Sequence, residues 1–392
     1  MILLFNSSSL FTAVASEPIP TLIASSQLEK EDFETASLSW VSPGDQRREE
    51  LQGKWNLRFG GRNFSEAEDE ATHIRMGLFV KGSYGLSSHM SLHADTGVSL
   101  VSGREQSRFA PAGEDSSQIL VNQFYFNYEP ADRLYLRIGA LSQGHIGNSN
   151  LIDPKMSFPG LMQQVWWSGD AWVSKLTLQQ VIPTSKSLDV DRQEKERLPT
   201  FYSETFSLLY KTKKWWEIEG SLTHFRFSNL PSVVAAKSGQ LGNTINGEYN
   251  ANSQFLFEFN GLSASGGLCL CGFEAIQYYL GYSYLENLEA DRGFSKGETL
   301  SLAVGIAGGN VVFKPKFTLI YNESDSSPAY YNDSGRGHNN RQGTESALSL
   351  EFTKLNFKLL AKYTSVDTIN DDPFQDSLAT TYVGLETMHV DF

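Results

Sequence analysis

The chain has 392 residues, of which 40% are hydrophobic and 20% are charged, and its formal net charge is −13. A nucleic-acid-binding domain would normally carry a basic patch or stripe, so this charge excludes nucleic acid as an expected partner. A helical membrane protein needs runs of roughly 18 or more apolar residues, and no such run occurs after residue 20. The composition leaves two classes open: a soluble protein of two or three domains, or a membrane protein that crosses with strands.

The amino-acid usage favours the second class. Aromatic residues make up 12% of the chain, with 33 glycines and only 13 prolines. Strands that pair edge to edge around a barrel tolerate few prolines, because proline has no N–H to donate to the ladder. Only every second residue of such a strand meets lipid, so the barrel needs no continuous hydrophobic run.

The N-terminal segment resembles an export signal of imperfect form. Ala13-Val14-Ala15 fits a small-residue cleavage site, but the apolar stretch 2–11 is interrupted by polar residues and no Lys or Arg precedes it. We therefore expect residues 1–15 to be a candidate signal peptide and 16–52 to be a periplasmic or flexible leader. A disordered tail is the alternative for residues 1–15.

The two cysteines, Cys269 and Cys271, are too few to build a structural zinc site. On a regular strand both side chains would point the same way, so a disulfide between them would need a distorted turn. We expect the pair to be structurally incidental. No metal or cofactor is predicted for the chain.

From residue 55 onward the chain repeats segments of alternating apolar and polar residues, each followed by a turn. Leu134–Ile138 and Phe357–Tyr363 are clear examples. This alternation indicates strands whose two faces meet different surroundings. About sixteen strands are expected, at 53–62, 73–85, 90–101, 118–128, 133–141, 161–167, 172–181, 204–211, 215–226, 253–262, 270–285, 297–307, 311–322, 344–353, 355–365 and 379–392.

The connectors between these strands alternate in length. Short connectors such as 129–132 and 212–214, together with a slightly longer turn at 263–267, separate long polar ones. Outer-membrane barrels show this alternation because their periplasmic turns are tight and their outer loops are long. A soluble sandwich or propeller has no reason to sort its loops in this way. The long connectors are expected at 63–72, 103–117, 142–160, 182–203, 227–252, 286–296, 323–343 and 366–378.

The positions of the tryptophans also indicate that the short turns lie at one membrane interface. Six of the 7 tryptophans are expected at strand ends beside the leader or a short turn: Trp55, Trp166, Trp167, Trp172, Trp215 and Trp216. Indole is apolar but prefers a hydrated hydrogen-bond partner, so tryptophan collects at a membrane interface. We therefore predict an antiparallel transmembrane β-barrel of all-β class, comprising residues 53–392.

The C-terminus resembles that of bacterial porins, whose last strand ends in phenylalanine. Here Phe392, Val390 and Met388 give apolar residues at alternate positions, whereas Val383 and Leu385 have the opposite parity, which a bulge near Glu386 would reconcile. The resemblance implies an outer-membrane porin of a Gram-negative bacterium. It also implies that Phe392 is the signal read by the barrel-assembly machinery, that lipid and lipopolysaccharide surround the barrel, and that a homotrimer is one possible assembly.

In porins the third outer loop folds into the barrel. The connector 142–160 is third in order and contains unusually many apolar residues for a solvated loop. We expect it to narrow the pore through Asp153, Lys155 and Phe158, although it lacks the acidic Pro-Glu-Phe-Gly-Gly stretch of enterobacterial porins. A loop folded over the barrel rim is the alternative.

Strand parity assigns the charged residues to the lumen. A basic wall is predicted from Arg58, Arg62, Arg75, Lys81, Arg133, Arg137, Lys314, Lys316, Lys358 and Lys362. An acidic wall is predicted from Glu217, Glu219 and Glu258, and Asp95 and Glu351 are also expected to point inward. The excess of basic residues predicts a water-filled channel with a mild preference for anions. Charges that merely hydrate the pore are the alternative.

Two other functions remain open from the sequence. Long outer loops would also suit an adhesin or structural anchor. An outer-membrane hydrolase is less favoured, because the chain contains none of the G-x-S-x-G, H-E-x-x-H or P-loop patterns. We therefore expect a channel rather than an enzyme.

Overall fold

The structure is a computed structural model, and it describes residues 51–66, 69–104, 117–183, 197–212, 215–248, 252–271 and 275–391. The predicted signal peptide 1–15, nearly all of the leader 16–52, and Phe392 lie outside the described residues.

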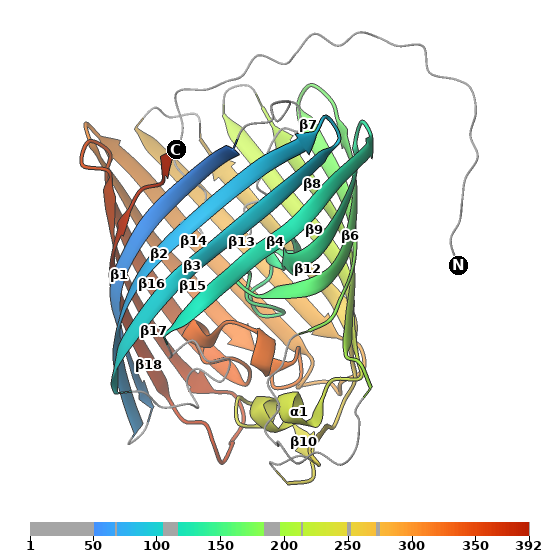
Figure 1. Ribbon diagram of the computed structural model, residues 1–392. Helices are drawn as coiled ribbons and strands as arrows, with labels where there is room; N and C mark the ends of the chain where they lie inside the picture. The colour runs from blue at the N-terminus through green and yellow to red at the C-terminus, as the bar shows by residue number, and fades with distance from the viewer. Residues whose placement is uncertain are drawn as a thin grey trace. The chain divides into compact units, whose positions relative to one another are not determined.

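In the described part of the chain, one antiparallel sheet closes on itself as a barrel (Figure 1). Consecutive barrel strands pair with one another, and β18 and β19 both pair with β1 to close the ring. Because β18 and β19 are two parts of one barrel strand, the described residues form sixteen barrel strands, as predicted. The strands are β1 (Leu51–Glu66), β2 (Asp69–Ser87), β3 (Met90–Arg104), β4 (Gln118–Ala131), β5 (Leu134–Ser142), β6 (Ser157–Ser168), β7 (Trp172–Val181), β8 (Thr200–Lys211), β9 (Trp216–Ser228), β12 (Phe259–Leu270), β13 (Ile276–Asn287), β14 (Lys296–Gly308), β15 (Val311–Asn322), β16 (Arg341–Phe352), β17 (Phe357–Thr368), β18 (Leu378–Thr387) and β19 (Val390–Asp391).

Several smaller elements lie in the long connectors. None of the described helices is long and apolar enough to cross a membrane. These elements are α1 (Ser232–Gly239), the 3-10 helices η3 (Gly144–Ile146), η4 (Ala329–Tyr331) and η5 (Ser334–Arg336), and the hairpin of β10 (Ile245–Asn246) with β11 (Gln254–Phe255).

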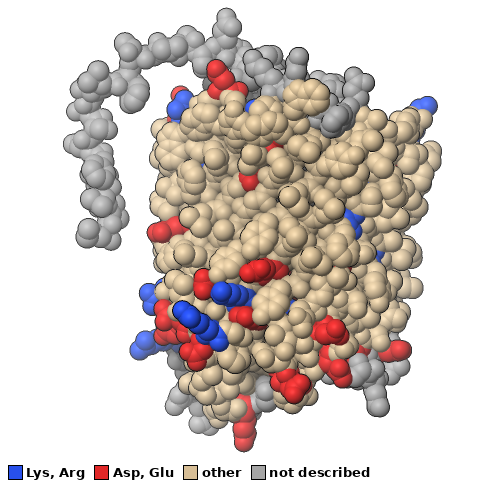
Figure 2. All heavy atoms as spheres, turned by 180° about the vertical axis from the view of Figure 1, so that it is seen from behind, with Lys and Arg blue, Asp and Glu red and all other residues tan. Residues whose placement is uncertain are grey.

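The two faces of the barrel strands differ as the alternating sequence predicts. On β2 the outward residues Ile74 and Met76 are each 52% exposed, whereas the intervening Arg75 faces the interior. Apolar side chains that are exposed on the outside of a closed barrel are the ones that meet lipid. Figure 2 shows one such face: charged residues gather toward the long-loop end, below a band in which they are sparse.

Several predicted strand boundaries were wrong. Residues 263–267 lie inside β12, which continues to Leu270, and β13 begins at Ile276. The glycines around Gly267 suggested a turn, but the strand continues through them. Residues 63–66 and 69–72, predicted as an outer loop, extend β1 and β2. Continuous pairing from Asn63↔Thr72 to Glu66↔Asp69 explains why this polar sequence is strand.

The C-terminal bulge is confirmed by the register. Arg58 pairs with Glu386, whereas Trp55 pairs with Val390, so the last strand carries one extra residue over this interval. The bulge keeps Val383 on the outward face and turns Glu386 inward. It therefore accounts for the change of parity in the sequence.

Candidate solute channel

The basic wall is largely placed as predicted. Nine of its ten residues lie on strands with their side chains on the interior face: Arg58, Arg62, Arg75, Lys81, Arg137, Lys314, Lys316, Lys358 and Lys362. These strands are β1, β2, β5, β15 and β17, and closure of β18 on β1 brings most of them to one side of the barrel. Strand parity alone was sufficient for this placement, because side chains alternate between faces.

Arg133 is the exception. It lies in the tight turn before β5, which begins only at Leu134, and its backbone adopts a positive φ of 91°. Its side chain is exposed. The prediction that Arg133 lines the pore was wrong, because the turn takes residue 133 out of the strand.

Acidic residues interleave with this basic wall. Glu386 lies 3.3 Å from Arg58 and 3.1 Å from Lys358. Glu345 lies 2.7 Å from Lys362 and also contacts Arg336 at 3.4 Å. The wall is therefore a network of ion pairs, and its field is weaker than a purely basic wall would produce.

Two further ion pairs lie on the interior face. Lys314 pairs with Glu351, and Lys81 lies 3.5 Å from Asp95. Glu351 and Asp95 were expected to point inward. Glu345, like Glu386, was missed by the sequence reasoning, although it shares its strand parity with Glu351 and could have been found from it.

The predicted acidic wall is reduced to two residues. On β9, Glu217 lies 3.4 Å from Lys211, and Glu219 accepts a hydrogen bond of 3.1 Å from the hydroxyl of Tyr279. Glu258 lies before β12 begins, and its side chain is exposed. Its prediction as a pore-lining strand residue was wrong, because the strand starts six residues later than the pattern indicated.

The connector between β5 and β6 runs from 143 to 156 and reaches strands on another part of the barrel. The side-chain amide of Asn148 donates to Ser263 Oγ and to the carbonyl of Tyr284, each at 3.0 Å. Ser221 on β9 donates to the carbonyl of Ile146 at 3.4 Å. These bonds hold the loop against the interior face of β9, β12 and β13.

The three residues predicted for this loop have different surroundings. Asp153 is buried, and its carboxylate accepts from the backbone N–H of Lys155 at 2.8 Å. The Lys155 side chain is exposed and acts electrostatically on Tyr382 of β18. Phe158 lies on β6 rather than in the loop, and its buried ring packs edge-on against Tyr331 at 5.3 Å. From β6 it therefore packs against the loop 323–340, to which Tyr331 belongs.

The connector after β15, residues 323–340, is almost entirely buried. Its Ser327 donates to the carbonyl of Asn150 at 2.7 Å, and its Tyr331 carbonyl accepts from the Asp153 N–H at 2.8 Å. Arg336 donates to Ser149. Figure 1 shows this segment inside the barrel toward the long-loop end. The interior of the barrel is thus occupied by two connected loops.

A third connector, between β9 and β12, is bonded to the loop 323–340 through an amide side chain. Asn243, which follows α1, donates to the carbonyls of Ser324 and Ser327, and its own carbonyl oxygen accepts from the Ala329 N–H at 2.7 Å. Asn339 donates to the same two carbonyls, each at 2.7 Å. Because both amides and their partners are buried, each bond replaces one that water would otherwise make. The sequence reasoning missed this network.

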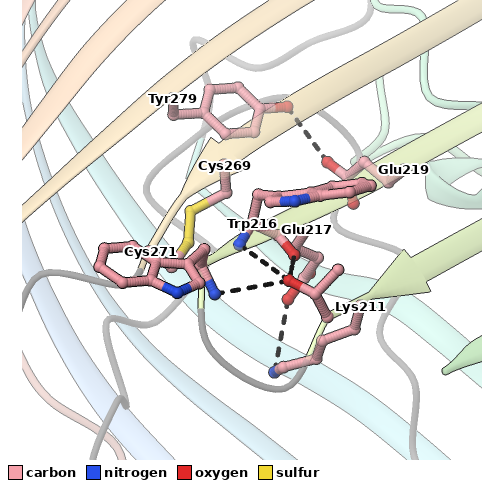
Figure 3. The surroundings of a disulfide bond; sticks show 9 residues. Lys211, Trp216, Glu217, Glu219, Cys269, Cys271 and Tyr279 are labelled. Atoms are coloured by element: carbon pink, nitrogen blue, oxygen red, sulfur yellow. Dashed lines mark hydrogen bonds and ion pairs between the residues drawn. A yellow bond between two sulfur atoms is a disulfide. The ribbon is translucent and has the colours of Figure 1, made fainter.

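The disulfide is a correction to the sequence analysis. Cys269 and Cys271 are bonded, with their Cα atoms 5.5 Å apart. Strand β12 ends at Leu270, so Cys271 leaves the strand direction, and its N–H donates to the carbonyl of Trp215 at 3.0 Å. Figure 3 shows the bond beside Trp216 and Glu217 of β9. The cysteines therefore join the end of β12 to its short turn rather than being incidental.

The barrel as a whole superposes on known barrels. OprB of Pseudomonas putida superposes with a TM-score of 0.56 at 10% identity, over 88% of this chain and 94% of that one. OmpF of Salmonella typhi, in a complex with daunomycin, gives a TM-score of 0.50 at 9% identity, over 87% of this chain and 97% of that one. This chain has the porin fold.

No protein-family model matches the sequence, and no curated protein sequence matches it. The identities to the porin structures are low, so the likeness concerns the fold. Within that porin fold, the loop 143–156 follows the fifth strand, the position that the sequence analysis assigned to an infolded loop. The loop 323–340 adds a second segment inside this barrel.

Proposed function

We propose that this chain is an outer-membrane channel for the passive diffusion of small hydrophilic solutes and ions. One observation carries the proposal: a closed barrel with an apolar exterior has charged side chains on its interior face and a loop crossing its lumen. Charged residues in a barrel interior hydrate a passage and select among solutes. The loop 143–156 would set the width of the passage, with Lys155 facing the charged wall.

The proposed channel leans mildly toward anions. The wall holds nine of the predicted basic residues, and four acidic residues interleave with them: Asp95, Glu345, Glu351 and Glu386. Lys155 adds a further positive charge from the loop. Fixed charges inside low-dielectric walls act on a passing ion more strongly than those on outer loops do, because bulk salt screens the latter beyond roughly 8–10 Å.

The location and partners follow from the same proposal. The exported chain would begin with a signal peptide at 1–15, and the leader 16–52 would lie in the periplasm. Lipid and lipopolysaccharide would contact the apolar exterior, the assembly machinery would read Phe392, and a homotrimer is the proposed assembly.

Single-channel recording in a planar bilayer tests the function. The purified chain, refolded in detergent and shown by circular dichroism to be rich in strand, should produce discrete conductance steps. The same sample after heat denaturation is the control. A folded barrel that inserts without conductance would overturn the channel and favour the structural anchor or adhesin.

A further inference from the structure

The disulfide between Cys269 and Cys271 has no role in the proposed channel. It encloses a single residue, Leu270, because the two cysteines are only two positions apart. The stabilisation that a disulfide gives by restricting the unfolded chain grows with the length of the loop it closes. A loop this short gains little from it, so the bond is poorly placed to stabilise the barrel.

The backbone at both cysteines is already held by other contacts. Cys269 is paired within the sheet on both sides, opposite Glu217 of β9 and Tyr279 of β13. The N–H of Cys271 donates to the carbonyl of Trp215 at 3.0 Å. None of these pairings depends on the S–S bond, so the reduced chain would keep the same strand order around the two thiols.

The bond also lies where a thiol can reach it. Both cysteines are partly exposed, and they lie at the end of β12 that faces the short connector to β13. At the neighbouring short connector, Trp215 is 57% exposed, and the 68% exposed Lys211 pairs with Glu217 at 3.4 Å beside the bond (Figure 3). These exposed polar groups indicate a hydrated rim, which the proposed orientation directs to the periplasm. Disulfides persist in that oxidising compartment, and exposed ones exchange most readily.

We propose that the Cys269–Cys271 disulfide is a site of thiol–disulfide exchange at the short-connector rim of the barrel, reduced by a thiol donor of the periplasm. The donor thiolate forms a bond to one of the two sulfurs as the S–S bond breaks, and the other sulfur leaves as a thiolate and takes a proton from water. A second donor thiol then displaces the chain from this mixed disulfide. Two electrons pass to the chain, which becomes a dithiol, while the donor becomes a disulfide. This activity goes beyond the channel and does not require conduction.

Reduction equilibria in the folded and the unfolded chain measure whether the bond is free to exchange. The full chain, folded in detergent or unfolded in urea, is equilibrated with mixtures of reduced and oxidised dithiothreitol, and free thiols are counted by reaction with a polymer-linked maleimide. A disulfide that stabilises the folded state is harder to reduce in that state, by the factor that corresponds to its stabilisation. We expect the two equilibrium constants to differ by less than about thirtyfold, because typical stabilising disulfides begin near this factor.

Two donors distinguish the source of the thiol. Reduced glutathione represents a small thiol, and thioredoxin whose second active-site cysteine is replaced by serine represents a Cys-x-x-Cys protein that retains its mixed disulfides. After quenching with N-ethylmaleimide, a glutathione adduct of the folded chain would identify a small thiol as donor, and a covalent complex with thioredoxin would identify a protein. Either product supports the exchange site. The control, Cys269→Ser with Cys271→Ser, should form neither product and should unfold at nearly the same urea concentration as the parent.

Three results would overturn the exchange site. Reduction that is disfavoured by more than about thirtyfold in the folded chain would make the disulfide a structural bond. A double serine variant that no longer forms a heat-modifiable barrel would lead to the same conclusion. The absence of both adducts on the folded parent would show that the sulfurs are not reachable. A chain that exchanges thiols but does not conduct would support the site and overturn the channel alone, whereas a conducting chain without exchange would do the reverse.

Discussion

Arg341 and Glu66, 275 residues apart in sequence, form a buried ion pair at the long-loop end of the barrel. Arg341 begins β16 and Glu66 ends β1, so the pair reaches across β17 and β18 near the closure of the ring. Arg341 also donates to the carbonyl of Gly337 at 3.3 Å, and Glu66 accepts from the N–H of Asp376 at 2.9 Å. One interaction therefore links two distant strands and two connectors.

Removing Arg341 should destabilise the barrel strongly. Arg341→Ala leaves a buried carboxylate with less compensation, which typically costs about 3–5 kcal/mol of unfolding free energy. Urea titration of the refolded chain in lipid vesicles measures the loss. Lys211→Ala is the control: Lys211 is 68% exposed in its pair with Glu217, and such pairs contribute less than about 1 kcal/mol. Equal losses in the two variants would contradict a structural role for the buried pair.

The wall of this barrel could be predicted from the sequence because strand geometry is local. A period of two residues determines which side chains share a face, so Arg75 and Lys358 were placed without knowledge of their neighbours. The same rule failed at Arg133 and Glu258, where the chain had left the strand. Strand ends depend on turn geometry, which the alternation of polarity does not report.

The contents of the barrel could not be predicted, because they depend on contacts between distant segments. Asn243 bonds to residues 81 and 84 positions away, and nothing local distinguishes it from a solvated asparagine. The polar composition of 323–340 resembles that of an exposed loop. The adjacent aromatic residues Tyr330 and Tyr331, both buried, are the signal in that segment that could have indicated an interior position.

Shortening the loop 323–340 should widen the passage. Replacing Ser324–Asn339 with a short Gly-Ser linker removes buried protein from the interior, so the single-channel conductance should rise while the barrel still assembles. The control replaces Glu289–Arg292, in the connector between β13 and β14, whose residues are mostly exposed. An unchanged conductance in the Ser324–Asn339 replacement would place that loop outside the current path.

Surface labelling should distinguish a long connector that lies outside the barrel from one that is buried inside it. A cysteine introduced at Asp189 should react with a membrane-impermeant maleimide on intact cells, because the connector 182–203 is predicted to lie outside. A cysteine at Ser326, which is completely buried, should remain unlabelled, although the sequence analysis counts 323–343 among the long outer loops. Pro130→Cys, at a short turn, should also be silent. Labelling at Pro130 with silence at Asp189 would reverse the orientation.

Deleting Phe392 should reduce assembly in cells more than stability in vitro. The resemblance to porins assigns this residue to recognition by the assembly machinery, a role that ends once the barrel has inserted. The amount of heat-modifiable barrel in outer-membrane fractions measures assembly, and urea titration of the refolded chain measures stability. Phe392→Ala would separate the aromatic ring from chain length. Normal assembly of the deletion variant would show that the signal lies elsewhere.

The ion preference should respond in opposite directions to two sets of substitutions. Arg75→Ala with Arg137→Ala removes positive charge from the interior face, so the channel should shift toward cations. Glu345→Gln with Glu386→Gln leaves their basic partners without counter-charges, so it should shift toward anions.

A reversal potential in a KCl gradient reports the ratio of chloride to potassium permeability. We expect each double variant to change this ratio about two- to threefold, the modest size expected for charges that mobile ions partly screen. The parent should favour chloride slightly, and the difference between the two variants should shrink at high salt. Substitution of exterior charges, as in Glu289→Gln, is the matched control and should leave the ratio unchanged, because that side chain is exposed in a connector outside the barrel strands. Clear cation preference in the parent, or shifts of the same sign in both variants, would contradict an interior field dominated by the basic wall.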